Sequence, residues 1–169
     1  MAISISGTTL TFNDNTIQTT ASKAIGASSH GGIYLGVFNT WDLISSTFNY
    51  QTTKQWKTTT TFTNGTASTT DGLANTNAMN NTTHPAAYYC ATSMDGVGGY
   101  TDWYLPSKDE LNRLYSDRSL IGGYASDDYW SSTENGANSS WSQTFSDGSQ
   151  NRNLKTDTYC VRPVRRLSL

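Results

Sequence analysis

The sequence has little charge, few cysteines and no long apolar run. Asp, Glu, Lys and Arg make up only 14% of its 169 residues, the net charge is -2, and there are two cysteines and three prolines. Binding to nucleic acid or to an anionic membrane needs clustered Lys and Arg, so we expect neither. No stretch approaches the roughly 20 apolar residues of a membrane span. The first ten residues also lack the basic start and apolar core of a secretory signal, so we expect any export to use another route, such as release with a particle on lysis.

The chain is instead rich in aromatic and uncharged polar residues. Aromatic side chains make up 12% of the residues, and Ser, Thr, Asn and Gly supply most of the polarity. This composition is typical of β-rich, often extracellular proteins. A chain of this length buries one good core, because domains typically hold roughly 100 to 150 residues. We therefore predict one domain with an N-terminal extension.

The N-terminal extension has the pattern of short strands with one apolar face. Ile3 and Ile5 alternate with polar residues, and a similar alternation follows over residues 10–17. A hairpin of this size is only marginally stable in water, so we expect it to pair with another chain or to pack against one. We predict that residues 1–29 form this attachment or oligomerisation segment with a polar linker, and that residues 30–169 form the main domain.

The main domain begins with a predicted strand, GGIYLGVF, and continues with two predicted helices. Between them, residues 47–81 are dominated by Thr, Ser and Asn, and we interpret them as strands and long loops. Pro85 suits the first turn of a helix that carries Cys90. Ser107 and Glu110 have the spacing of a capping box at the start of the second helix. The apolar stripe of this second helix consists of Leu111, Leu114 and Tyr115.

After the helices the pattern returns to strands. The predicted strands are YWSST, SWSQTF and LKTDTYCVRPV, separated by the turn clusters ENGANSS and SDGSQNRN. In the middle strand, Trp141, Gln143 and Phe145 share one face, whereas Ser142 and Thr144 share the other. Helices followed by an antiparallel sheet place the domain in the α+β class.

The ordered motifs of this half of the chain resemble a known family. GGYTDWYLPSKDELNRLY, IGGY, YWSSTE, FSDGSQ and YCVRPVRR resemble the domain at the C-terminus of the Legionella collagen-like adhesin, which is related to the C-type-lectin fold. The resemblance implies two helices and a curled antiparallel sheet whose later loops form a binding face. It also implies a disulfide between Cys90 on the first helix and Cys160 on the last strand, which would stabilise the domain by roughly 4 kcal/mol in the chain-entropy model. Two reduced, buried cysteines are the alternative.

A second resemblance concerns the N-terminal segment. The stretch LTFNDNTIQTTA, at Leu10–Ala21, resembles a short segment that recurs in phage tail proteins. Together the two resemblances imply a phage tail-fibre or receptor-binding protein of the virion, a homotrimer whose N-terminal segment contacts other virion proteins. One alternative is a structural virion protein, such as a collar, neck or capsid decoration. Another is a variable protein of a diversity-generating retroelement.

The predicted binding face lies on the segments ENGANSSWSQ and DGSQNRNLKTD. Aromatic side chains give contact area at low entropy cost and amides give adaptable donors and acceptors, which suits a bacterial surface glycan or a protein receptor. We assign the neighbouring Trp130 to the core, whereas for Trp141 a core role and a surface role are both open. The candidate ligand-binding residues are Asn135, Asn138, Trp141, Gln143, Gln150, Asn151, Arg152, Asn153 and Lys155.

Catalysis finds little support in the residues. The formylglycine-generating oxidases, which are enzymatic relatives of this fold, use two closely spaced cysteines near the C-terminus, and only Cys160 lies there. We interpret His84 as a capping or surface residue at a helix start rather than as a general base. Asp127, Asp128 and Glu134 offer the oxygen ligands that Ca²⁺ prefers, but we favour a solvated acidic turn. We therefore predict a binding protein that needs no cofactor.

Three arginines lie close together near the end of the sequence. Arg162, Arg165 and Arg166 alternate along a predicted terminal strand. We expect them to pair with acidic neighbours such as Asp109 or Glu110 rather than to bind nucleic acid.

Overall fold

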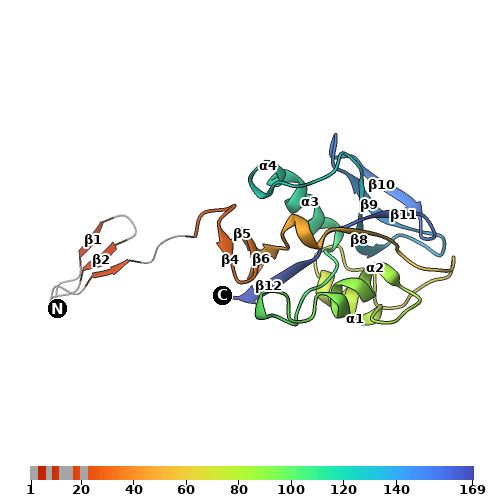
Figure 1. Ribbon diagram of the computed structural model, residues 1–169, viewed down its shortest axis with the longest axis horizontal. Helices are drawn as coiled ribbons and strands as arrows, with labels where there is room; N and C mark the ends of the chain where they lie inside the picture. The colour runs from red at the N-terminus through yellow and green to blue at the C-terminus, as the bar shows by residue number, and fades with distance from the viewer. Residues whose placement is uncertain (1–3, 7–8, 12–16, 20–22) are drawn as a thin grey trace.

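The structure, a computed structural model, describes residues 4–6, 9–11, 17–19 and 23–169 (Figure 1). The strands of these residues are β1 (Ser4–Ser6), β2 (Thr9–Thr11), β3 (Ile17–Thr19), β4 (Ser28–Ser29), β5 (Gly32–Phe38), β6 (Trp41–Ser45), β7 (Thr52–Gln55), β8 (Asp128–Glu134), β9 (Ser139–Thr144), β10 (Gln150–Leu154), β11 (Thr158–Val161) and β12 (Val164–Ser168). The helices are α1 (Gly72–Ala78), α2 (Pro85–Tyr88), α3 (Lys108–Ser116) and α4 (Arg118–Ile121), with short turns η1 (Phe48–Tyr50), η2 (Tyr89–Ser93) and η3 (Val97–Gly99). None of the helices in the described part of the chain is long and apolar enough to cross a membrane.

The first three strands form a small antiparallel sheet of their own, in the order β1-β2-β3. Figure 1 shows this sheet apart from the rest of the chain. The prediction of short strands is confirmed for residues 4–6, 9–11 and 17–19, whereas Ile3 and Phe12 lie outside the described residues. The predicted linker is shorter than expected, because β4 already pairs with β5 through Ser28 and Ile33. The division at residues 29 and 30 stays a prediction.

The main sheet has the strand order β10-β9-β8-β11-β7. Its pairs are antiparallel except one, since β11 runs parallel to β8 with Cys160 opposite Tyr129. The sequence predicts an antiparallel sheet, and the parallel pair arises because β11 keeps the direction of β10 but lies on the other side of β8. The sheet is curled, and the fold is α+β, as predicted.

The last predicted strand, LKTDTYCVRPV, is divided in the structure. A turn separates β10 from β11, with Asp157 N donating to Leu154 O at 2.9 Å. Pro163 follows β11, and the chain then enters a second sheet of order β12-β6-β5-β4. Proline has no N–H to donate to a ladder, so it suits the point where the chain leaves one sheet for another. The residues QNRN, predicted as part of a turn, form the edge strand β10 together with Leu154.

The two predicted helix starts are confirmed. Pro85 opens α2, which continues into the π-helical turn η2. Ser107 and Glu110 form both hydrogen bonds of the capping box at the start of α3. Helices α1 and α4 are additional to the two predicted. The helix α1 lies in the Thr- and Asn-rich tract, where helix propensity is weak, and Asp71 marks its start by accepting a hydrogen bond from Ala74 N.

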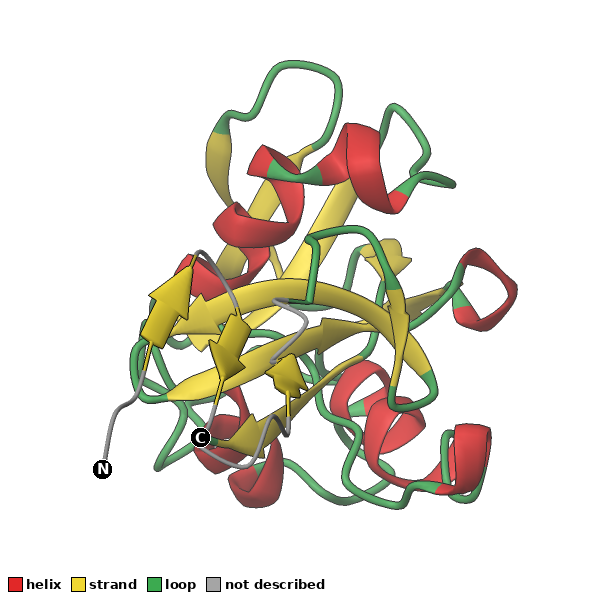
Figure 2. Cartoon of the chain, turned by 90° about the vertical axis from the view of Figure 1, so that its left-hand side faces the viewer, coloured by secondary structure: helices red, strands yellow, loops and turns green. Residues whose placement is uncertain are grey.

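Two large apolar clusters lie on opposite faces of the main sheet. One is formed with the second sheet and α3, and it contains Leu35, Leu43, Leu111, Leu114, Tyr129, Phe145 and Cys160. The other is formed with α1 and α2, and it contains Trp56, Met79, Ala86, Ala87, Cys90, Trp130 and Val161. Figure 2 shows the strands in the middle with helices above and below. The prediction that Trp130 is a core residue is confirmed, since it is fully buried.

The cysteines do not form the predicted disulfide, and the reason is strand alternation. Both thiols are free and buried. Cys90 packs in the α2 cluster with Val161 of β11, whereas the adjacent Cys160 belongs to the α3 cluster. Successive side chains of a strand point to opposite faces of the sheet. The sheet therefore separates the two sulfur atoms, and burial raises the pKa of both thiols.

Candidate binding surface on β8, β9 and β10

The predicted ligand-binding residues do not form a single surface. On β10, Asn151 and Asn153 contact the polar face of β9, whereas Arg152 lies beside Trp141, with its guanidinium carbon 5.8 Å from the ring centroid. Gln150 also belongs to this second face, because its Nε2 donates to the carbonyl of Lys108 at 3.4 Å. Because β10 is a strand and not a loop, its side chains alternate between the two faces. The predicted set is therefore split in two.

Two of the predicted ligand-binding residues are buried, which corrects their assignment. Gln143 is 1% exposed, and its Nε2 donates to Asn112 Oδ1 at 2.9 Å. Lys155 is fully buried and forms an ion pair with Glu134. Its Nζ also donates to Thr61 O at 2.9 Å. Both side chains have partners inside the domain, so they hold the fold together rather than face a ligand.

Two others lie at the end of the sheet. Asn135 and Asn138 are exposed in the turn between β8 and β9. The Nδ2 of Asn135 donates to Ser139 Oγ at 3.1 Å, and the carbonyl of Asn138 accepts from Lys155 N at 3.0 Å. Both residues lie in the turn next to the end of β10, but their side chains are outside the hydrogen-bonded set of Asn151 and Asn153.

One face of β8, β9 and β10 carries a connected set of polar side chains, which are half-buried except for the buried Ser142. Asn153 Nδ2 donates to Asp128 Oδ2 at 2.8 Å and to Ser142 Oγ at 2.9 Å. Asn151 Nδ2 donates to Thr144 Oγ1 at 3.0 Å, and Thr144 in turn donates to Asp128. Each amide uses its nitrogen within the set, so its Oδ1 is left as an acceptor without a partner among the described residues.

The same face continues onto β11. Tyr159 lies beside Asp128, because β8 and β11 run parallel with Cys160 opposite Tyr129. Its ring meets Trp130 at 4.9 Å between centroids. Burial, together with nearby Asp157 and Asp128, raises the pKa of the Tyr159 hydroxyl, which keeps it neutral. We call the six side chains of this face the polar row: Asp128, Ser142, Thr144, Asn151, Asn153 and Tyr159.

The sequence predicted only two members of the polar row. It identified Asn151 and Asn153 as binding residues, and it placed Ser142 and Thr144 together on one face of β9, but without assigning them a role. The sequence pattern groups Asp128 with Asp127 and Glu134 in a solvated acidic turn. In the structure these two acids lie at opposite ends of β8, and Glu134 accepts hydrogen bonds from Lys155 Nζ and a loop amide instead.

Comparison with known proteins places the polar row within a family domain. The sequence model of the Lcl C-terminal domain matches residues 45–165. The chain belongs to this family. The match confirms the resemblance to the C-terminal domain of the Legionella collagen-like adhesin, and it contains every residue of the polar row. The likeness to C-type lectins stays a prediction.

A solved structure supports the fold. A fimbrial protein from Bacteroides ovatus superposes with a TM-score of 0.56 and is 16% identical over 95% of this chain and 48% of its own. The chain thus spans about half the length of that protein, and a likeness at this identity concerns the fold alone. The comparison with curated proteins finds no match.

The opposite face of β9 and β10 in this Lcl C-terminal domain is partly covered by α3. The ammonium of Lys108 lies 4.0 Å from the centroid of the Trp141 ring. Arg152 lies at the neighbouring strand position and is exposed. Trp141 is therefore half-buried, between the core and surface roles that the sequence left open. The lysine over its ring leaves less aromatic surface for a sugar to stack on.

His84 is buried, which corrects its assignment as a capping or surface residue. It is 4% exposed and makes no side-chain capping bond at the start of α2. Its Nε2 lies 2.9 Å from Thr63 Oγ1, and its ring meets Trp56 edge-on at 5.6 Å. Burial, together with the charges of Lys57 and Lys155, lowers the pKa of His84 to about 4. The imidazole is therefore neutral at pH 7.

The three arginines near the end of the chain have other partners than predicted. Arg165 forms a bidentate ion pair with Asp102, at 2.7 and 2.8 Å. Arg166 donates to Asp71 at 3.0 Å. Arg162 is buried and donates mainly to backbone carbonyl oxygens. Two of the three arginines therefore pair with acids, as predicted. The acids are Asp102 and Asp71, however, and not Asp109 or Glu110 of α3.

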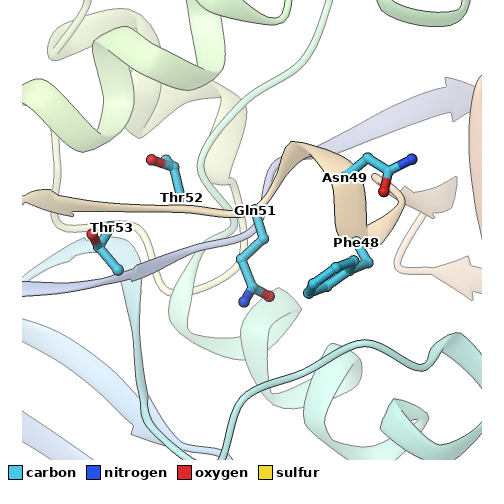
Figure 3. Close-up of a pocket in the computed structure, with 5 residues that line it drawn as sticks. All are labelled: Phe48, Asn49, Gln51, Thr52 and Thr53. Atoms are coloured by element: carbon cyan, nitrogen blue, oxygen red, sulfur yellow. The ribbon is translucent and has the colours of Figure 1, made fainter.

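A separate open hollow of about 570 Å³ lies at the start of β7. Figure 3 shows that the side chains of Phe48 and Gln51 extend to the same side of the chain. Gln51 already has partners, because its Oε1 accepts from Tyr129 OH at 2.7 Å and from Arg162 at 3.3 Å. The hollow also has one exposed aromatic ring, Phe48, next to the polar side chains of Asn49, Thr52 and Thr53, all on one short segment. The polar row instead joins side chains of three strands in one hydrogen-bonded set, so we place the candidate site there.

Proposed function

We propose that the protein is a phage tail-fibre or receptor-binding protein that recognises a bacterial surface glycan or protein receptor through the polar row. Membership of the Lcl C-terminal domain family and the fold shared with a fimbrial protein support an adhesin-like surface protein without catalytic activity. The observation that carries the proposal is the pair of half-buried amides on β10, each fixed through its nitrogen.

The chemistry of the polar row fits hydroxyl groups. A sugar hydroxyl donates to one group and accepts from another, and the row offers amide oxygens, a carboxylate and a phenol in a fixed arrangement. Side chains already held by neighbours lose little conformational freedom on binding, which favours affinity. Tyr159 adds aromatic surface beside these groups.

A double variant tests this proposal. Purified, fluorescently labelled protein is bound to a panel of bacterial strains, and binding is measured by flow cytometry. Replacing Asn151 and Asn153 by alanine should lower binding to a responsive strain by about tenfold or more, since a net hydrogen bond contributes about 1 kcal/mol and two are removed. Asn135→Ala is the matched control, because this amide is exposed but lies outside the polar row. Unchanged binding by a folded double variant would exclude the polar row.

We further propose that residues 1–29 attach the protein to other virion proteins and hold it as a homotrimer. The small sheet β1-β2-β3 supports this, because a sheet of such short strands gains stability from a partner. Light scattering of the full chain should then give three times the monomer mass, and a monomer at micromolar concentration contradicts the assembly.

A structural role in the particle is a second candidate, and the likeness to a fimbrial protein favours it. A receptor binder lies at the distal end of a tail or fibre, whereas a collar or capsid decoration does not. Gold-labelled antibody on intact particles, viewed by electron microscopy, separates the two positions.

A further inference from the structure

A second pocket lies far from the polar row, on the β12-β6-β5-β4 sheet. It has a volume of about 420 Å³, within the range of small-molecule sites. The turn between β5 and β6, the helix α1, the loop that precedes Trp103 and the end of β12 all contribute to it. We call it the Trp41 pocket, and its lining residues are Thr40, Trp41, Leu73, Asp102, Arg166 and Ser168.

Two charged groups reach the Trp41 pocket with only part of their hydrogen-bonding capacity used. Arg166 donates one bond to Asp71 at 3.0 Å, and its guanidinium carbon lies 4.4 Å from the Trp41 ring centroid. Asp102 accepts two bonds from Arg165, yet its side chain is 44% exposed. The guanidinium thus keeps free N–H donors, and the carboxylate keeps free lone pairs.

The charges around the pocket cancel. Two arginines face two aspartates, in the pairs Arg165 with Asp102 and Arg166 with Asp71. A charged ligand would meet no net opposite charge here, so the lining favours a neutral polar ligand. Both ion pairs also hold their members in place, which lowers the cost of ordering the site.

Trp41 also carries an unpaired donor. Its Nε1 is buried and has no hydrogen-bond partner among the described residues. Buried polar groups in folded proteins are nearly always paired, so the Trp41 side chain is incompletely satisfied. The indole and Leu73 also give the pocket apolar surface next to its polar groups.

We propose that the Trp41 pocket binds a neutral, hydroxyl-rich ligand of the size of one sugar ring. The hydroxyl groups accept from Arg166 and donate to Asp102, and the apolar part of the ring packs on Leu73 and on the part of the Trp41 indole that Arg166 leaves uncovered. The site is independent of the polar row, since the two share no residue and lie on different sheets.

Titration with monosaccharides, followed by NMR of the ¹⁵N-labelled full chain, tests the pocket. Glucose, galactose, mannose and N-acetylglucosamine are added separately, each also as its methyl glycoside, and the Trp41 indole signal is assigned with Trp41→Phe. At least one sugar should shift this signal and the amides of Thr40 and Ser168, with saturation in the millimolar range. A response to both forms indicates that the pocket accepts a glycan terminus, and a response to the free sugar alone indicates a ligand with a free anomeric hydroxyl.

Variants separate the two sites. Asp102→Asn keeps the size of the side chain. It should lower the affinity for the sugar by about tenfold, which is the effect of one charge-assisted hydrogen bond. Thr40→Val removes an exposed hydroxyl group from the pocket lining. It serves as a second variant if Asp102→Asn lowers stability, and it should also weaken the binding of the sugar. The Asn151→Ala/Asn153→Ala protein should bind the sugar normally even where its adsorption to cells is lost. If no sugar shifts the Trp41 signal, or if both pocket variants respond as the natural chain does, the pocket is not a sugar site.

Discussion

Replacing Lys155 by methionine should lower the free energy of unfolding by about 3 kcal/mol, because it leaves a buried carboxylate without its counter-ion. The Lys155 side chain is fully buried and that of its partner Glu134 is 10% exposed. Methionine keeps most of the apolar contact with Trp56, whose ring centroid lies 4.9 Å from Nζ. The change therefore removes mainly the charge and its hydrogen bonds.

The magnitude follows from what Glu134 retains. Breaking a buried ion pair typically costs about 3 to 5 kcal/mol. Glu134 is not completely buried, and its Oε1 still accepts from Thr63 N at 2.8 Å. We therefore take the lower end of the range, which corresponds to a fall in melting temperature of about 6 to 12 °C for a chain of this size.

Chemical denaturation measures the effect, with a double variant as the internal check. The Glu134→Gln/Lys155→Met protein contains no orphan charge, so it should be more stable than Lys155→Met alone. Lys23→Met, at an exposed lysine, should stay within about 0.5 kcal/mol of the natural chain. A loss below about 1 kcal/mol for Lys155→Met, with weakened receptor binding, would refute the structural role and restore Lys155 as a ligand contact.

Three further predictions concern other buried groups. The pKa of His84 is about 4 in the folded chain and about 6.5 in the unfolded chain, so between these pH values the unfolded state binds the extra proton. Stability should therefore fall as the pH drops from about 6.5 to about 4, and then level off. A His84→Gln protein whose stability has the same pH dependence in denaturation experiments would contradict this. Cys90 and Cys160 are free and buried, so a thiol reagent should label neither in native protein and both in denaturant; a mass change with reductant would instead reveal a disulfide. Ser107→Ala removes half of the capping box of α3 and should cost about 1 kcal/mol in thermal unfolding, and an unchanged melting temperature would show that the cap contributes nothing.

The predicted binding residues show how much a sequence can say about a site. Polar composition indicates the segments around β9 and β10, and Asn151 and Asn153 are members of the proposed polar row. Lys155, however, has the same polar character in the sequence and is fully buried. A charged side chain is buried when a partner is placed beside it, and the partner here is 21 residues away in the chain.

The sequence by itself determined the local elements of this protein. Three of these local features are found in the structure: the cap at Ser107, the helix start at Pro85 and the alternation along β9. Each depends only on residues within a few positions of one another. These features follow from backbone hydrogen bonding and side-chain periodicity, which need no distant partner.

Only the tertiary structure decided which face of each strand meets which helix. Alternation shows that Cys160 and Val161 point to opposite sides, but not that α2 and Cys90 pack on the side of Val161. Tertiary packing likewise placed Asp128 beside the two amides of β10 and Tyr159 beside Asp128, and it brought Asp102 and Arg166 together in the Trp41 pocket. Strand order and sheet curl set these contacts, and both depend on packing between segments far apart in the chain.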